Sequence, residues 1–238
     1  MQFTIPNLKV SAVTRYNCEV CKDKGFVLET INGYEYAKPC KCKIQADLKA
    51  DLRRSGLDDK MLERMSFDRY EAVEDFQQRA KSTAYQFSQQ AEVKGFYIGG
   101  QVGCGKTHLC TAICNEFYKQ GKPFRYVIYG EIIRELKALV NDAEDYNRLM
   151  NRLCQVKILY IDDMFKGGTS EADIKHFFRL INSRYISQKT TIISSELMLN
   201  EVMAIDEAIG SRIKQMCGKF VLNIAKVRER NYRLKVVV

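Results

Sequence analysis

The stretch Gly100-Gln101-Val102-Gly103-Cys104-Gly105-Lys106-Thr107 decides the fold, because it is a complete Gly-x-x-x-x-Gly-Lys-Thr pattern. An apolar run at 96–99 precedes it and an amphipathic segment follows, which is the setting of a phosphate-binding loop. Backbone N–H groups of such a loop and the start of the next helix face the phosphates. We therefore expect an ATP site in which Lys106 reaches the β- and γ-phosphates and the Thr107 hydroxyl binds Mg²⁺. The expected nucleotide contacts are Gly100, Val102, Gly103, Cys104, Gly105, Lys106, Thr107 and His108.

From Gly95 onward the chain alternates short apolar runs with amphipathic segments, the pattern of a parallel sheet flanked by helices. Strands are expected at 96–99, 124–128, 158–161, 190–194 and 220–224. Helices are expected at 105–120, 130–140, 171–187 and 199–216. The predicted fold class is therefore α/β, with a five-stranded parallel sheet.

Two carboxylates follow the apolar run at 158–161, at the sheet edge where open parallel sheets bind ligands. We expect Asp162 to hold Mg²⁺ through water, and Asp163 to orient or deprotonate the attacking water. Alone, the pair would more often be a strand ending in a turn with two solvated acids. The phosphate loop upstream favours the catalytic interpretation.

Two further catalytic candidates lie later in the chain. Ser195, with Ser194 next, is expected to contact the γ-phosphate or the attacking water, although serines also cap helices. Arg212, in Gly210-Ser211-Arg212-Ile213, has the position from which an arginine crosses a subunit interface and stabilises a neighbour's transition state. A lone arginine is more often a surface residue, so this assignment depends on the ordered set of motifs.

Four cysteines near the N-terminus have the spacing C-x₂-C-x₁₈-C-x-C. Four thiolates complete a tetrahedral structural zinc site and leave no open position for catalysis. Free thiols or a redox pair are the alternatives. A segment of this size with few large apolar side chains needs such a metal to fold, so zinc is favoured. The expected ligands are Cys18, Cys21, Cys40 and Cys42.

Composition excludes several classes of protein. With 46% hydrophobic and 28% charged residues, the 238-residue chain has the makeup of an ordinary globular protein. The net charge is +9, and its excess lies at 211–238, which suits nucleic acid, an acidic protein partner or a solvated face. No apolar run approaches the roughly 18 residues of a membrane span, and no signal peptide is recognisable, so we expect a cytoplasmic protein without membrane contact.

The ordered motifs resemble those of AAA+ ATPases, and more specifically DnaC/DnaI-type helicase loaders encoded by phages of Gram-positive hosts. The resemblance covers nearly the whole chain. It is carried by Cys18-x-x-Cys21, Pro39-Cys40-Lys41-Cys42, Ser66-Phe67-Asp68-Arg69-Tyr70, Leu159–Lys166, Thr190–Glu196 and Ala208–Ile213. It implies a domain without the C-terminal helical lid of other AAA+ proteins, Arg212 as the arginine acting in trans, and Phe67 near the adenine.

The resemblance also implies partners: ATP-dependent self-association, single-stranded DNA, and a DnaB-type hexameric replicative helicase. Weaker assignments give Arg134 and Lys137 to DNA. The expected domains are 1–43, a zinc-binding helicase-interaction domain; 44–66, a linker; and 67–238, the AAA+ ATPase domain. An IstB-like transposition-helper ATPase is the main alternative. A small-molecule P-loop kinase and an ATP-gated adaptor with little hydrolysis are the others.

Overall fold

The structure is a computed structural model that describes residues 16–234, apart from positions 32, 55, 56, 58 and 91. By its internal contacts the chain divides into two compact units, Met1–Asp47 and Leu48–Val238. The division lies within 44–66, the segment expected to be a linker. Two helices occupy much of that segment, α1 (Lys41–Arg54) and α2 (Asp59–Arg64), and Leu57 and Leu62 are buried in the core of the second unit.

The first unit is built around one antiparallel hairpin. Strands β1 (Phe26–Ile31) and β2 (Tyr34–Pro39) pair from Phe26 opposite Pro39 to Ile31 opposite Tyr34. Gly33, at φ +82°, supplies the left-handed residue that the tight turn requires. A lone two-stranded hairpin is marginal in water, so this one depends on another stabilising element.

The second unit contains the predicted five-stranded sheet, in the order β4-β5-β6-β3-β7. All four pairings are parallel, which confirms the predicted α/β fold class. Most residues of β3 to β6 are buried because helices cover both faces of the sheet. The strands are β3 (Gly95–Gly100), β4 (Phe124–Ile128), β5 (Ile158–Met164), β6 (Thr190–Ser195) and β7 (Val221–Ile224).

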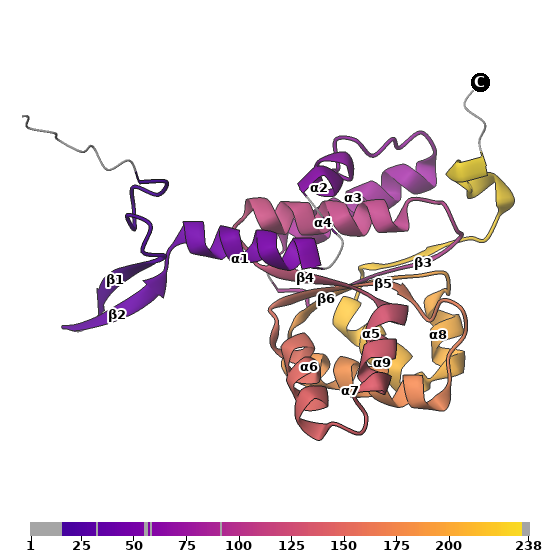
Figure 1. The fold of residues 1–238 in the computed structure, drawn as a ribbon. Coiled ribbons are helices and arrows are strands. Elements are labelled where there is room, and N and C mark those ends of the chain that lie inside the picture. Colours follow the sequence, from indigo (N-terminus) through magenta and orange to yellow (C-terminus); the bar gives the residue numbers. More distant parts are fainter. Residues whose placement is uncertain (1–15, 32, 55–56, 58, 91, 235–238) are drawn as a thin grey trace, which may run out of the picture. The chain divides into compact units, whose positions relative to one another are not determined.

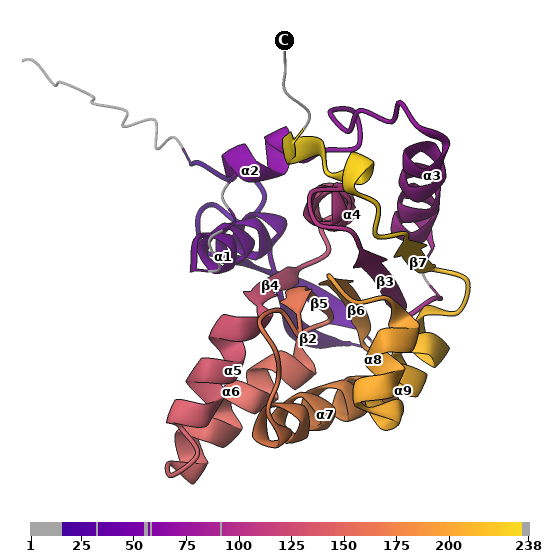
Figure 2. The same ribbon diagram turned by 90° about the vertical axis from the view of Figure 1, so that its right-hand side faces the viewer.

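Helices of the second unit form one layer on each side of this sheet (Figure 1). One layer, with its own buried cluster, consists of α2, α3 (Asp75–Gln89) and α4 (Lys106–Lys119). The opposite layer packs a second cluster and consists of α5 (Tyr129–Ala138), α6 (Ala143–Gln155), α7 (Glu171–Ile186), α8 (Leu199–Ile205) and α9 (Glu207–Cys217). The view in Figure 2 separates the two layers across the sheet.

The helix boundaries differ from the prediction at two places. The helix expected at 199–216 is broken at Asp206, where the backbone is extended and the side chain caps the next helix by accepting from Ile209 N at 2.7 Å. An additional helix, α6, follows an Asp142 cap. Beyond β7 the described chain forms two short 3₁₀ turns, Arg228–Arg230 and Tyr232–Leu234. Within the described residues, every helix is too short or too polar to cross a bilayer.

Candidate functional site

The phosphate loop joins β3 to α4, and its shape requires glycine at the helix start. Gly105 has φ +92°, and a Cβ at this position would lie 2.7 Å from the Tyr70 ring. The Lys106 ammonium donates to the carbonyl of Gly100 at 2.9 Å and to that of Gln101 at 2.7 Å. It therefore lies within the turn of the loop, the region where phosphates bind in proteins with this motif.

Asp162 lies at the C-terminal edge of the sheet and is surrounded by hydroxyl donors. Thr107 Oγ1 donates to Asp162 Oδ1 at 3.3 Å, and Ser194 Oγ donates to the same oxygen. Tyr126 OH donates to Oδ2 at 3.2 Å, and burial together with this carboxylate raises the Tyr126 pKa, which keeps the phenol protonated. Adjacent oxygens of an octahedral Mg²⁺ shell lie about 2.9 Å apart. The two residues predicted to bind Mg²⁺ thus lie together at a spacing that fits this ion.

Asp163 points away from that cluster and forms an ion pair. Its backbone N–H donates to Asp162 Oδ1 and to Ser194 Oγ, both at 3.1 Å, while its φ is +54°. A left-handed non-glycine residue is uncommon and marks a constrained turn. Lys166 Nζ lies 2.7 Å from Asp163 Oδ2 and 3.5 Å from Glu196 Oε1, and the bond to Asp163 raises the Lys166 pKa.

The structure separates the two serines that end β6. Ser194 contacts Asp162, whereas Ser195 Oγ donates to the Met164 carbonyl at 2.7 Å and accepts from Leu197 N at 3.1 Å. Successive side chains of a strand point to opposite faces, so only one of two adjacent serines can face the carboxylate. Of the two serines, Ser194 therefore faces Asp162, while contact of Ser195 with the γ-phosphate or the attacking water stays a prediction.

A cavity of about 220 Å³ lies beside the phosphate loop, and we call it the loop-side cavity. Phe67, expected near the adenine, is buried in the core with its ring edge-on to Tyr85 and does not line this cavity. His108 does line it and donates to the Ser66 carbonyl at 2.8 Å, and burial lowers its pKa. The lining residues are Arg69, Tyr70, Glu71, Gln77, Gly103, Cys104, Gly105, His108 and Tyr232.

Two other loop positions differ in exposure. Val102 lies at the loop tip with 37% of its surface exposed, whereas Cys104 is buried, which raises the pKa of its thiol. The backbone of both residues remains available to the loop, because the motif permits any side chain there.

Arg212 lies on α9, in the helical layer on the opposite side of the sheet from α4 (Figure 1). Its Nε donates to Asn182 Oδ1 at 2.9 Å, and its guanidinium lies 5.0 Å from the centre of the Phe178 ring. It is partly exposed. The arginine is thus held in place on the surface of its own subunit, away from the helix that opens at its own phosphate loop.

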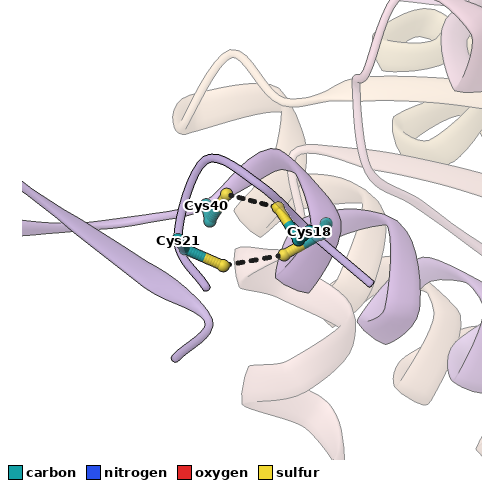
Figure 3. Close-up of side chains that lie close together, drawn as sticks. Cys18, Cys21 and Cys40 are labelled. Atoms are coloured by element: carbon teal, nitrogen blue, oxygen red, sulfur yellow. Dashed lines mark hydrogen bonds between the residues drawn. The ribbon is translucent and has the colours of Figure 1, made fainter. Parts of the chain in front are cut away.

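The four predicted zinc ligands, Cys18, Cys21, Cys40 and Cys42, come together in the first unit as what we call the four-cysteine cluster (Figure 3). All four Sγ atoms lie within 4.8 Å of one another, with Cys18 to Cys40 at 3.8 Å and Cys21 to Cys42 at 3.3 Å. These distances are too long for disulfides. A tetrahedral site with Zn–S bonds of about 2.3 Å has sulfur atoms about 3.8 Å apart, so the cluster fits zinc.

Hydrogen bonds within the four-cysteine cluster change the pKa of two of its thiols in opposite directions. Hydrogen bonds from the Cys21 backbone and the Cys42 side chain lower the pKa of Cys18 to about 7. The hydrogen bond to Cys21 raises the pKa of Cys42 to about 12. Thiolate is the form that binds metal, so the cluster already stabilises one such ligand near neutral pH.

The basic residues considered for DNA lie on two parts of the chain, the helix α5 and the C-terminal region. Lys137, on α5, forms an ion pair with Asp173 at 2.9 Å, and Arg134 lies one turn earlier on the same helix. In the C-terminal basic region, Lys226 pairs with Glu201 at 2.7 Å. Lys235 lies outside the described residues. DNA contact by these residues stays a prediction.

Comparison with known proteins defines the family. A family model described as IstB-like ATP binding protein matches residues 43–235. The chain belongs to this family. It is 31% identical over 241 residues to the phage-like element PBSX protein XkdC of Bacillus subtilis, across 95% of this chain and 90% of that protein. It is 26% identical over 151 residues to the replicative helicase loader DnaC of Escherichia coli K12, across 62% of this chain and 60% of that one.

A solved structure gives the same fold. The crystal structure of the DnaC helicase loader matches 71% of this chain and 99% of its own, with a TM-score of 0.60 at 21% identity. The predicted P-loop domain of AAA+ type and the resemblance to DnaC/DnaI-type loaders are therefore confirmed. Similarity to a protein of a Bacillus phage-like element supports the expected phage origin in a Gram-positive host.

Sequence reasoning missed several residues of the site. Tyr126 gave no signal, because a tyrosine in a buried strand is indistinguishable from a core residue. Lys166 ends the quoted family stretch Leu159–Lys166 but had no role. Tyr70 belongs to a quoted family stretch but had no role, and Tyr232 lies in a basic tail with no recognisable pattern.

Proposed function

We propose that this protein is an ATP-dependent loader of the replicative DNA helicase onto single-stranded DNA, active in the bacterial or phage-infected host cytoplasm. The observation that carries the proposal is the combination, in one chain, of an ATP site and a four-cysteine cluster beside an exposed apolar hairpin. Similarity to a protein named as a replicative helicase loader supports it. The nucleotide site alone fits many AAA+ ATPases, so the N-terminal unit makes the proposal specific.

ATP would bind with its phosphates in the loop, next to the Lys106 ammonium. Mg²⁺ held by Thr107 and Asp162 would neutralise charge on the β- and γ-phosphates. Ser194 and Tyr126 fix the Asp162 carboxylate, since each donates a hydrogen bond to one of its oxygens. Asp163, partly exposed at the same edge, would accept a proton from the attacking water.

The Lys166 ion pair has a consequence for that proton transfer. While Lys166 Nζ bonds Asp163 Oδ2 at 2.7 Å, this carboxylate oxygen is engaged by the ammonium group. We expect hydrolysis to be faster when this pair opens or when Lys166 shifts toward Glu196, which lies 3.5 Å from the same ammonium. The arrangement supports the expectation that turnover in the isolated chain is slow.

The first unit would supply the helicase contact. Both faces of its hairpin carry exposed apolar side chains, among them Leu28 at 61% and Tyr34 at 71% exposure. Exposed large apolar groups gathered on a small element indicate an interaction surface. Phe26, Ile31 and Tyr36 extend it. The four-cysteine cluster would hold the base of the hairpin, because Cys40 directly follows β2.

Capture of purified replicative helicase from the host by the full chain tests this proposal. We expect retention of the helicase by the wild-type protein and loss of it in Tyr34→Glu and in protein treated with a zinc chelator. Glu29→Gln, on the same hairpin but polar already, is the matched control and should retain binding. Equal capture by Tyr34→Glu and the wild type would exclude the hairpin as the contact. Phosphate release should rise when single-stranded DNA is added.

An IstB-like transposition helper is the second candidate, favoured by the description of the matching family model. It would use the same ATP site but bind a transposase and duplex DNA. Stimulation of ATP hydrolysis by duplex DNA, with no effect of single strands and no capture of helicase, would favour this candidate over the loader.

A further inference from the structure

The chain beyond β7 returns to the phosphate loop. Residues 228–234, here called the C-terminal segment, form two 3₁₀ turns. The Tyr232 backbone N–H donates to the Gly103 carbonyl at 3.0 Å, which joins this segment directly to the loop. In Figure 2 the segment, coloured yellow, lies on the same side of the sheet as α3 and α4.

The fit between the segment and the loop is close. A Cβ at Gly103 would lie 2.0 Å from Asn231 Oδ1, so a larger residue here would push the Asn231 side chain aside. The same Asn231 Oδ1 accepts from Arg233 N at 3.1 Å, which fixes its orientation. The Arg230 guanidinium lies 4.6 Å from the centre of the Phe76 ring on α3. One end of the segment is thus attached to α3 and the other to the loop.

Tyr232 also lines the loop-side cavity, together with residues from other parts of the second unit. Tyr70 and Gln77 provide an aromatic ring and a buried amide, and Gly103 to Gly105 provide the wall that continues to the phosphates. The cavity is therefore aromatic and polar at once. A flat heteroaromatic ring with ring nitrogens and an exocyclic amine matches such a lining.

We propose that the C-terminal segment forms the outer wall of the nucleotide-base subsite, and that Tyr232 packs against the purine of bound ATP. The inference rests on the proposed ATP site and adds to it a specificity-determining residue.

Equilibrium binding of two ligands tests whether Tyr232 contacts the base of ATP. A fluorescent ATP analogue reports the base and the phosphates together, and inorganic tripolyphosphate, as a competitor, reports the phosphates alone. Loss of one stacking contact weakens base binding by roughly tenfold. We expect Tyr232→Ala to bind the ATP analogue about tenfold more weakly than wild type, with unchanged competition by tripolyphosphate. Tyr232→Phe should bind like wild type. Tyr16→Ala, the same change at an exposed tyrosine of the other unit, is the matched control.

Tyr232→Leu provides a second test if Tyr232→Ala fails to fold, because leucine keeps apolar bulk and removes the ring. Unchanged affinity for the ATP analogue in these variants overturns the inference. A parallel loss of tripolyphosphate affinity also overturns it, because the segment would then support the loop and not the base. If the wild-type protein binds neither ligand, the ATP site itself fails, and that outcome is separate from a defect confined to Tyr232 variants.

Discussion

At the scale of single residues, the hydrogen bonds to Asp162 depend on which side chain of β6 faces this carboxylate. The structure places Ser194 there and turns Ser195 toward the Met164 carbonyl. Asp162 therefore receives hydroxyl donors from three separate elements: Thr107 on α4, Tyr126 on β4 and Ser194 on β6. Such surrounding contacts orient a ligand carboxylate before the metal arrives.

Replacing the two serines separately tests this assignment. Ser194→Ala removes a hydrogen bond to Asp162, the carboxylate that we propose as a Mg²⁺ ligand, and losses of about 10- to 100-fold are typical for such contacts. We expect the rate of phosphate release to fall within that range. Ser195→Ala, measured alongside, should change the rate much less. A larger loss for Ser195→Ala than for Ser194→Ala would contradict the geometry.

The variant Asp163→Asn distinguishes a role of Asp163 in ATP hydrolysis from a role in ATP binding. The amide preserves the shape of the side chain but cannot take a proton, and general bases contribute about 10²- to 10⁴-fold. Phosphate release should fall by this factor while affinity for the fluorescent ATP analogue is retained. Lys166→Met, which frees the carboxylate, should raise basal hydrolysis. Equal turnover in Asp163→Asn and wild type would assign the base elsewhere.

The residues at the C-terminal edge of the sheet differ in how well the sequence predicts them. Some residues are recognisable because their expected chemistry requires fixed residue types at fixed spacings. They are Lys106, Thr107, Asp162 and the four cysteines. Tyr126 and Tyr232 cannot be recognised in this way. Their contacts are with residues far away in the sequence, which only the folded structure brings close. The choice between Ser194 and Ser195 depends on strand register, and a one-residue difference reverses the face.

At the scale of elements, a buried arginine joins α6, α7 and β6. Arg184 is fully buried, and its guanidinium donates to the carbonyls of Leu153, Val156 and Thr190 at 2.6 to 2.9 Å and to Thr191 Oγ1 at 2.9 Å. Burial lowers its pKa to about 10, so it remains charged at neutral pH. These bonds satisfy carbonyls at the end of α6 and the start of β6.

Arg184→Met should destabilise the second unit by about 3 kcal/mol, because it leaves several buried carbonyls without donors. Urea unfolding monitored by circular dichroism measures the change. Arg179→Met is the control: it lies on the same helix but exposed, bonded to Asn147 at 2.9 Å. A loss in Arg184→Met no greater than in Arg179→Met would show that the buried bonds contribute little net stability.

Zinc removal tests whether the folding of the first unit depends on metal binding. Its hairpin has little buried apolar surface, so metal binding should supply its folding free energy. We expect one zinc ion per chain by atomic absorption, and none in Cys18→Ser. Chelator should abolish the hairpin signals in NMR spectra, while the melting of the second unit changes little. Cys154→Ser, a substitution of a buried cysteine on α6, should retain zinc. Full zinc content in Cys18→Ser would exclude the four-cysteine cluster as the zinc site.

At the scale of the whole molecule, the second unit carries the phosphate loop and Arg212 on two different surfaces. The phosphate loop opens at the C-terminal edge of the sheet, beside α4, while Arg212 lies in the layer across the sheet. The arginine is held by Asn182 and by the ring of Phe178. A preoriented cation that does not serve its own nucleotide suits a site completed by a second subunit, as in other enzymes that hydrolyse nucleotides with an arginine in trans.

Mixing of variants decides whether Arg212 acts in trans. An arginine supplied by a neighbour contributes about 10³- to 10⁵-fold to hydrolysis, so Arg212→Ala alone should be nearly inactive while still binding ATP. Asp163→Asn should be inactive for a different reason, since it lacks the base but retains the arginine. When the two inactive variants are mixed, some interfaces pair an intact base with an intact arginine, and activity should return. Lys214→Ala, an exposed change on the same helix, should behave like wild type alone and in mixtures. Absence of recovery in a mixture that still self-associates would show that Arg212 does not complete its neighbour's site.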